Sequence, residues 1–263
     1  MLGGKFSLSI LISCLLFLNY PVAVSQSKRV FVYTSLARAK ERFATYKEMF
    51  QKGEYPQAEK ALKDCLRQVR ITYIKRLLWE VVFYKGVAVN PAKALFILWK
   101  LLYLYPEDEI VLTLGQETKN KLEILLGSPE NPSILDIPTY ATLKNIKINK
   151  ETYAKLKEAL LVQIEKALSE SESKLHELIN TNNPLHWSIV IEKHAYILQQ
   201  LRSACGGLLV CLGDLYLQQN DLARARSAYK TCLELYPDSE SAILAGFKLQ
   251  EIERMKPNEK GAE

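Results

Sequence analysis

Apolar residues recur at intervals of three and four along nearly the whole chain after residue 30. This spacing places them on one face of an α-helix. Turn-forming residues, mainly Gly, Pro, Asn and Asp, separate the periodic stretches. The pattern therefore predicts an all-α protein. The predicted helices cover residues 38–51, 56–69, 71–84, 91–105, 109–126, 150–179, 185–203 and 241–255, with two more helices inside 207–240.

Residues 207–240 are the most regular part of this pattern. They predict one helix–turn–helix unit, with Asn220-Asp221-Leu222 as the turn and Pro237 at the end of the second helix. A unit of this kind buries its apolar face only by stacking on neighbouring units. The defining positions are Leu209, Leu212, Gly213 and Tyr216 in the first helix, and Ala225, Tyr229, Cys232 and Leu233 in the second.

The length of this unit, about 34 residues, and its residue pattern resemble a tetratricopeptide repeat. Small Gly213 and Ala225 stand where the two helices of such a repeat cross, and two tyrosines fill the space beside them. Asn220 replaces the usual turn glycine, and Cys232 replaces the usual alanine. Asn tolerates the left-handed backbone better than most residues, and Cys behaves as a small buried hydrophobe. The resemblance implies an α-solenoid of stacked helical hairpins that binds other proteins.

Two weaker units precede this repeat. The helix pair within 38–69 follows the same pattern around Gly53, except that Tyr46 stands where a small residue is expected. The pair within 71–105 resembles a Sel1-like repeat, a slightly longer relative of the same hairpin. This second pair is rich in aromatic residues. We interpret them as core, because rings at helical spacing usually pack, with a ring-lined ligand groove as the alternative.

The helical pattern divides into two halves. Residues 30–126 form an N-terminal repeat region, and residues 150–255 form a C-terminal region that closes with a capping helix at 241–255. The segment 127–149 contains three prolines and is predicted to be a linker or a long surface loop. Residues 256–263 are polar and are predicted to form a flexible tail.

The N-terminus has the pattern of an export signal. A short positive start precedes an apolar stretch at 6–18, which is too short for a comfortable membrane span. Ala23 and Ser25 then predict cleavage of residues 1–25 as a signal peptide. Two alternatives stay open. One is an uncleaved membrane anchor, and the other is lipidation at Cys14, since Leu11-Ile12-Ser13-Cys14 resembles the lipobox of bacterial lipoproteins.

Charge changes this picture little. The formal net charge of +6 falls to +5 when residues 1–25 are removed, because they contain one lysine and no acidic residue. Basic and acidic residues are interspersed along the helices, as on solvated helix faces. Runs of Lys and Arg with interleaved aromatics, which would predict a nucleic-acid surface, are absent from the sequence.

Four cysteines follow the predicted signal. We expect free, buried thiols, because Cys65 and Cys232 occupy matching positions in their repeats. Cys205 and Cys211 lie six residues apart, which separates their Cα atoms by about 9 Å on one continuous helix, beyond bridging reach. A bridge between them requires a break at Gly206-Gly207, and this alternative stays open.

Catalytic and cofactor-binding motifs are absent from the sequence: there is no glycine-rich phosphate loop, HExxH, CxxC or GxSxG. His176 has Glu172 one helical turn away, the spacing of an ordinary surface pair. His186 and His194 are too far apart on one helix to hold a single metal ion. We therefore predict no catalytic residue, no cofactor and no metal site.

The function predicted from these features is that of an exported protein-interaction scaffold, periplasmic or envelope-associated in a bacterium and in the secretory pathway otherwise. A partner peptide or helix is expected in a concave groove built by the first helices of the hairpins. Asp214, Gln218 and Gln219, expected to be exposed there, are the candidate contacts. The alternatives are a membrane-anchored or lipidated component of an envelope assembly, and an envelope enzyme whose catalytic groups lie within 109–204.

Overall fold

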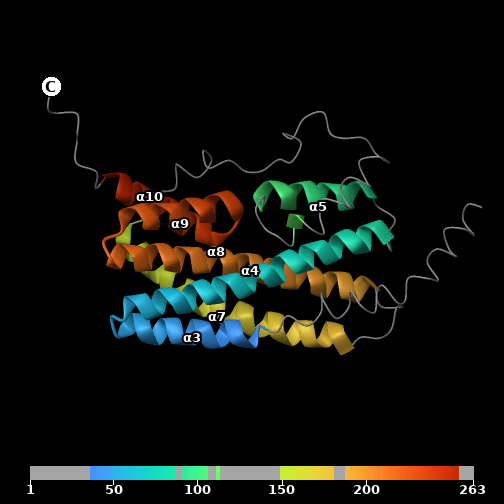
Figure 1. The fold of residues 1–263 in the computed structure, drawn as a ribbon, viewed down its shortest axis with the longest axis horizontal. Helices are drawn as coiled ribbons and strands as arrows, with labels where there is room; N and C mark the ends of the chain where they lie inside the picture. The colour runs from blue at the N-terminus through green and yellow to red at the C-terminus, as the bar shows by residue number, and fades with distance from the viewer. Residues whose placement is uncertain (1–35, 87–90, 106–110, 113–148, 181–186, 255–263) are drawn as a thin grey trace, which may run out of the picture. The chain divides into compact units, whose positions relative to one another are not determined.

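The structure is a computed structural model, and it describes residues 36–86, 91–105, 111–112, 149–180 and 187–254. The predicted signal peptide and the tail 256–263 lie outside the described residues, as do all but the last residue of the predicted linker 127–149 and all but two residues of the predicted helix 109–126. In the described part of the chain, helices joined by short turns are the only regular secondary structure, which confirms the all-α, tetratricopeptide-like fold class (Figure 1). Its helices are α3 (Ala37–Gln51), α4 (Tyr55–Gly86), α5 (Pro91–Leu104), α7 (Lys150–Asn180), α8 (Trp187–Gln218), α9 (Leu222–Leu235) and α10 (Glu240–Arg254).

Two of the predicted helix boundaries are wrong. The predicted helices 56–69 and 71–84 are one continuous helix, α4, because the residues between them contain neither Gly nor Pro to interrupt it. The predicted helix 185–203 likewise runs through Gly206-Gly207 into the repeat, as α8. A helical Gly costs about 1 kcal/mol relative to Ala. The close packing of neighbouring helices against these two glycines explains why they occur inside α8.

Helix α8 is the centre of the fold, in contact with α4, α7, α9 and α10 (Figure 1). Three glycines let neighbouring helices come close to it. A Cβ atom added at Gly207 would lie 2.8 Å from Ile164 of α7, and one added at Gly206 would lie 3.0 Å from the Ser239 hydroxyl just before α10. One added at Gly213 would lie 2.4 Å from the ring of Tyr229 on α9. Buried residues of α3, α4, α7, α8, α9 and α10 belong to one hydrophobic core, so the two predicted halves share it.

The hairpin of α8 and α9 has the packing expected from the repeat pattern. Gly213 lies against Tyr229, and Ala225 is fully buried. Asn220 has a φ of 58°, which confirms that it takes the left-handed conformation of the usual turn glycine. Gly53 has a φ of 74° at the equivalent turn between α3 and α4. The Asp221 side chain then caps α9 by accepting a hydrogen bond of 2.9 Å from the Arg224 backbone N–H.

Cys65, Cys205, Cys211 and Cys232 are all free and buried, as predicted. Because α8 is unbroken at Gly206-Gly207, the geometry that would allow a bridge between Cys205 and Cys211 does not arise. Burial raises the pKa of Cys205 to about 12 and the pKa values of the other three thiols above their usual range. These side chains therefore behave as small hydrophobic groups of the core.

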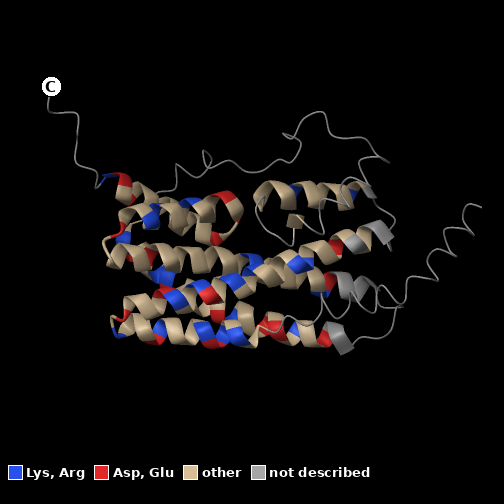
Figure 2. Ribbon diagram, in the orientation of Figure 1, with Lys and Arg blue, Asp and Glu red and all other residues tan. Residues whose placement is uncertain are grey.

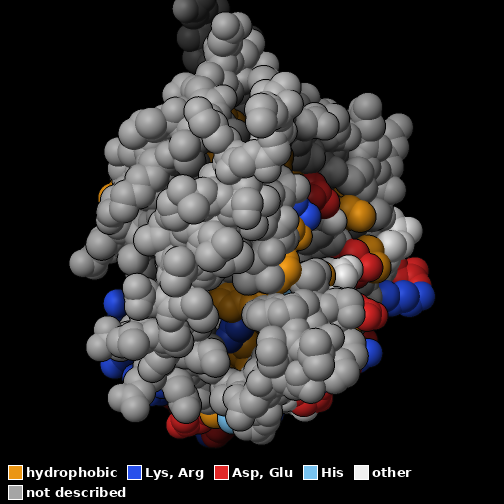
Figure 3. Space-filling view, turned by 90° about the vertical axis from the view of Figure 1, so that its right-hand side faces the viewer, with side chains coloured by type: hydrophobic (Ala, Val, Ile, Leu, Met, Phe, Trp, Pro, Cys, Tyr) orange, Lys and Arg blue, Asp and Glu red, His pale blue; other side chains and the backbone are white. Residues whose placement is uncertain are grey.

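The aromatic residues of the 71–105 pair range from buried to exposed. Phe83 and Tyr105 are buried, which confirms the core interpretation for them, whereas Phe96 and Tyr103 on α5 are exposed. Figure 3 views the end of the helices where α4 and α7 finish and α5 and α8 begin, and hydrophobic, basic and acidic side chains are all visible there. Basic and acidic residues are interspersed along α3, α4 and α7, as predicted for solvated faces (Figure 2).

One stretch of the described helices, Glu192–Gln218 of α8, is long and apolar enough to cross a membrane by length and composition. Most of this stretch is buried against the neighbouring helices. Its apolar character is therefore accounted for by its place at the centre of the core.

Candidate functional site

Helices α3 and α8 are the first helices of the α3/α4 and α8/α9 hairpins, and the capping helix α10 follows α9. The sequence predicts a partner groove on the face of such first helices. Helix α7 packs on α8 along this face and also contacts α3 and α10. Part of the face on which the sequence predicts a groove is therefore covered. The chain covers part of this face with one of its own helices, and a smaller pocket is left beside it.

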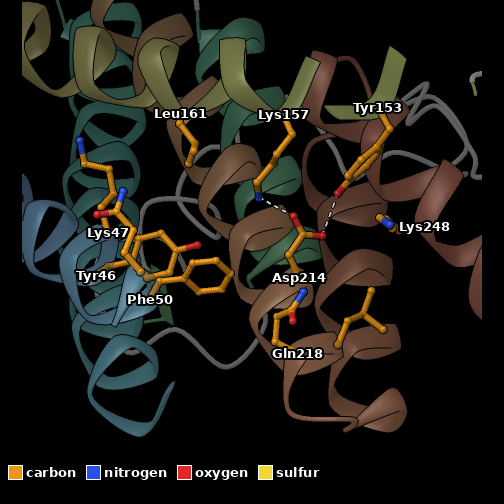
Figure 4. Close-up of a pocket in the computed structure, with 11 residues that line it drawn as sticks. Tyr46, Lys47, Phe50, Tyr153, Lys157, Leu161, Asp214, Gln218 and Lys248 are labelled. Carbon is orange, nitrogen blue, oxygen red and sulfur yellow. Dashed lines mark hydrogen bonds and ion pairs between the residues drawn. The ribbon is translucent and has the colours of Figure 1, made fainter. Parts of the chain in front are cut away.

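This pocket has a volume of about 330 Å³ and lies between α3, α7, α8 and α10. Figure 4 shows Tyr46 and Phe50 on α3 facing Asp214 and Gln218 on α8, while Tyr153 and Lys157 point in from α7. The volume is at the small end of the range of about 300–1,000 Å³ typical of ligand sites. The lining residues are Tyr46, Lys47, Phe50, Gln51, Tyr153, Lys157, Leu161, Asp214, Leu217, Gln218 and Lys248.

Several lining residues of α3, α8 and α10 occupy equivalent positions of the repeat pattern. Lys248 follows Asp214 by one repeat period of 34 residues. Aligning the turn residues Gly53 and Asn220 places Lys47 at the same position as Asp214. The same alignment pairs Phe50 with Leu217 and Gln51 with Gln218. Helices α3, α8 and α10 thus contribute residues from equivalent positions to the pocket, and α7 adds Tyr153, Lys157 and Leu161.

The inner wall of the pocket is a closed polar network around Asp214. Its carboxylate accepts hydrogen bonds from the hydroxyls of Tyr153 at 2.7 Å and Tyr229 at 2.5 Å, and it pairs with Lys157 at 2.6 Å. Burial acts to lower the pKa of Lys157, but the Asp214 carboxylate and the Cys211 thiol together outweigh this effect and raise the pKa. Lys157 also donates to the Cys211 thiol at 3.3 Å. The Asp214 carboxylate is therefore held by three side chains of the protein itself.

These contacts change the roles of the predicted partner-binding residues. The expectation that Asp214 is exposed is wrong, because its side chain is only 16% exposed and three neighbours hold its carboxylate. Gln218 is exposed and lines the pocket. Gln219, one residue further along α8, is half-buried and does not belong to the lining. Of the three residues, Asp214 and Gln218 line the pocket, and Gln218 is the exposed one.

The other two lysines of the lining are held by acidic residues at its edge. Lys47 on α3 forms an ion pair with Glu165 on α7. Lys248 pairs with Glu251 at 2.7 Å and lies 4.4 Å from the centre of the Tyr153 ring. These contacts place charged groups around an apolar interior lined by Tyr46, Phe50 and two leucines.

Sequence reasoning missed the residues that α3 and α7 contribute. Tyr46 and Phe50 are four residues apart, and so are Tyr153 and Lys157, so each pair shares one face of its helix. The sequence feature that could have indicated these residues is Tyr46, which stands where the repeat pattern has a small residue at the helix crossing. In the structure, its ring lies 5.7 Å from that of Phe50 at the pocket.

The histidines differ from one another in their surroundings. His176 pairs with Glu172 at 3.2 Å on the surface, as predicted, and His186 lies outside the described residues. His194 is buried: its ring lies 4.4 Å from the Trp79 ring, and its Nδ1 lies 3.6 Å from Glu80. Burial lowers the pKa of His194. Over residues 36–254, wherever the structure describes the chain, it shows no group of three or more His, Cys, Asp or Glu side chains that could hold a metal ion.

The stacked hairpins and the pocket on their first helices define a helical-repeat scaffold of the kind that mediates protein–protein interactions. Comparison with known families supports this class directly: residues 207–239 match the tetratricopeptide repeat family model. Searches of curated proteins and of solved structures gave no significant match. The family match points to a non-catalytic repeat scaffold.

Proposed function

We propose that this protein is an exported scaffold of the tetratricopeptide type that holds a partner peptide or helix at the pocket between α3, α7, α8 and α10. The observation that carries the proposal is that three helices line the pocket with the same position of the repeat pattern. That position is Lys47 on α3, Asp214 on α8 and Lys248 on α10. Repeat scaffolds bind their partners with such positions, because each stacked unit presents the same face.

The walls of the pocket suit an anchoring contact. Binding energy at protein interfaces concentrates in a few well-packed, desolvated pockets surrounded by groups that exclude water. Here the polar network of Asp214 keeps one wall rigid, and the ion pairs of Lys47 and Lys248 surround the opening. A partner would therefore gain most from the side chain that it inserts, and less from its contacts at the edge.

A pull-down from native extract tests the proposal with two matched variants. Gln218→Trp places a large ring at the pocket, whereas Gln219→Trp places the same ring one residue away, outside the lining. Both variants should fold, as checked by circular dichroism, because neither residue is fully buried. We expect partners recovered by wild type and Gln219→Trp to be lost with Gln218→Trp. Equal recovery by all three proteins would remove the pocket from the interface.

The proposal places the protein outside the cytoplasm, in a bacterial periplasm or envelope or in a secretory pathway. Its support is the apolar stretch 6–18, followed by the small residues Ala23 and Ser25. Mass spectrometry of the mature N-terminus tests this part. A chain that begins at Gln26 is the expected result. A lipid-modified Cys14, or residues 1–25 retained in a membrane fraction, would favour a membrane-held component of an envelope assembly instead.

A further inference from the structure

We infer that the pocket takes a bulky, uncharged aromatic side chain of the partner, rather than a carboxylate or an ammonium group. This inference rests on the proposed function and gives the chemistry of the contact. Apart from the polar wall around Asp214, the interior surface is mainly apolar, formed by the rings of Tyr46, Phe50 and Tyr153 and by the aliphatic side chains of Leu161 and Leu217. Removing such surface from water favours an apolar occupant.

The charges of the pocket are already balanced within the chain. Each of its three lysines has its own carboxylate: Lys157 has Asp214, Lys47 has Glu165 and Lys248 has Glu251. A carboxylate from a partner must therefore displace one of these acidic groups to gain an ion pair. A partner ammonium group finds the Asp214 carboxylate occupied by three donors. Either charged group loses its hydration without full compensation.

The shape of the site favours a single inserted side chain. Helix α7 covers part of the face formed by α3, α8 and α10, so a whole helix has no continuous groove along these three elements. A volume of about 330 Å³ is suited to one large side chain and its immediate neighbours. The exposed Gln218 amide at the pocket offers hydrogen bonds to an indole N–H or a phenol hydroxyl.

Blocked amino acids test this chemistry without a known partner. The probes are Nα-acetyl-tryptophan amide, Nα-acetyl-glutamate α-amide and Nα-acetyl-lysine amide, the last with a free side-chain ammonium group. Each probe is titrated into protein with isotope-labelled Leu methyl groups, and binding is followed by NMR. We expect saturating shifts at Leu161 and Leu217 with the tryptophan probe, and affinities weaker by about tenfold or more for both charged probes. Gln218→Trp should abolish the tryptophan shifts, while Gln219→Trp should keep them.

Three results would overturn the inference: a charged probe that binds as tightly as the tryptophan probe, no saturable binding of the tryptophan probe, or equal loss in both variants. These results are distinguishable from a failure of the proposed function. If only Gln218→Trp loses partner capture but the tryptophan probe does not bind, the proposed function is supported and the aromatic specificity is contradicted. If the tryptophan probe binds at the pocket but wild type captures no partner, the aromatic specificity of the pocket is supported and the proposed function is not.

Discussion

Gly213 in the C-terminal hairpin and Tyr46 in the N-terminal hairpin hold the same repeat position, seven residues before the turn residue with positive φ. At Gly213 the two helices of the hairpin meet, with the Tyr229 ring packed on the glycine. At the equivalent place, Tyr46 instead stacks on Phe43, lies tilted against Phe50 and reaches the Cys211 thiol on α8. In the α8/α9 hairpin, this position lets the two helices pack closely together. In the α3/α4 hairpin, the side chain at this position contacts α8 and lines the pocket.

The neighbouring position shows the same contrast in charge. Asp214 is mostly buried and is held by Lys157, Tyr153 and Tyr229. Lys47, its equivalent on α3, forms a half-exposed ion pair with Glu165. Side chains at equivalent positions of a repeat thus contribute differently to the free energy of unfolding, because different neighbours pack against them. This difference also explains why the family match is confined to 207–239, where the helix crossing has the small residues of the repeat pattern.

The largest expected effect compares these two charged positions. Asp214→Ala should lower the free energy of unfolding by about 3 kcal/mol or more, because it leaves the buried Lys157 ammonium without its partner. Lys47→Ala removes a half-exposed pair and should cost about 1 kcal/mol or less. Urea unfolding of both variants measures the difference. Equal destabilisation would show that the Asp214 network is no more important than a surface ion pair.

The second prediction concerns the helix crossing. Gly213→Ala places a methyl group 2.4 Å from the Tyr229 ring and should destabilise the protein by about 1–3 kcal/mol through overpacking. Gly206→Ala is the matched control on the same helix. Its methyl group would lie 3.0–3.2 Å from Ser239 and Ser241 side-chain atoms, and the Ser239 hydroxyl can rotate away. Thermal melts should show the larger loss for Gly213→Ala. The reverse order would contradict the assignment of this crossing.

Features that depend on residues close together in the chain could be predicted from the sequence. Helical periodicity, the left-handed turn at Asn220 and the close approach at Gly213 follow from residues near one another in the chain. The continuity of α8 through two glycines depends on α7 and α10 packing against them. The burial of Asp214 likewise depends on Tyr153 and Lys157, whose helix begins 64 residues earlier at Lys150. Such long-range partners leave no periodic signal of their own in one sequence.

A third prediction uses pH to test the contact between the hairpins. Glu59 on α4 accepts a hydrogen bond of 3.1 Å from Tyr216 on α8 and pairs with Arg224 on α9 at 3.2 Å. Burial acts to raise the pKa of Glu59, but hydrogen bonds from Lys63 and Tyr216 and the Arg224 charge outweigh it and lower the pKa. Because the folded-state pKa is depressed, this stabilisation is present above the unfolded-state pKa and is lost as pH falls through the folded-state value.

Glu59→Gln should therefore be less stable than wild type near neutral pH, by about 1 kcal/mol or less, since the site is partly solvated. The gap between the two proteins should close as pH falls below about 4.5. Urea midpoints measured from pH 7 to pH 3 give this comparison. A gap that stays constant or widens in acid would show that the Glu59 carboxylate does not hold the two hairpins together.

The smallest expected effect concerns the four thiols, which the two hairpins share. Cys65 and Cys232 hold equivalent positions on the second helices, and both are buried and free. Reducing agent should therefore leave the melting temperature unchanged, whereas the loss of a native disulfide typically costs about 2–4 kcal/mol. Because burial raises their pKa values, these thiols should resist alkylation in the folded protein and react fully in denaturant without reductant. Peptide mass spectrometry that finds any of Cys65, Cys205, Cys211 or Cys232 unreactive in denaturant would reveal a bridge and contradict their assignment as core residues.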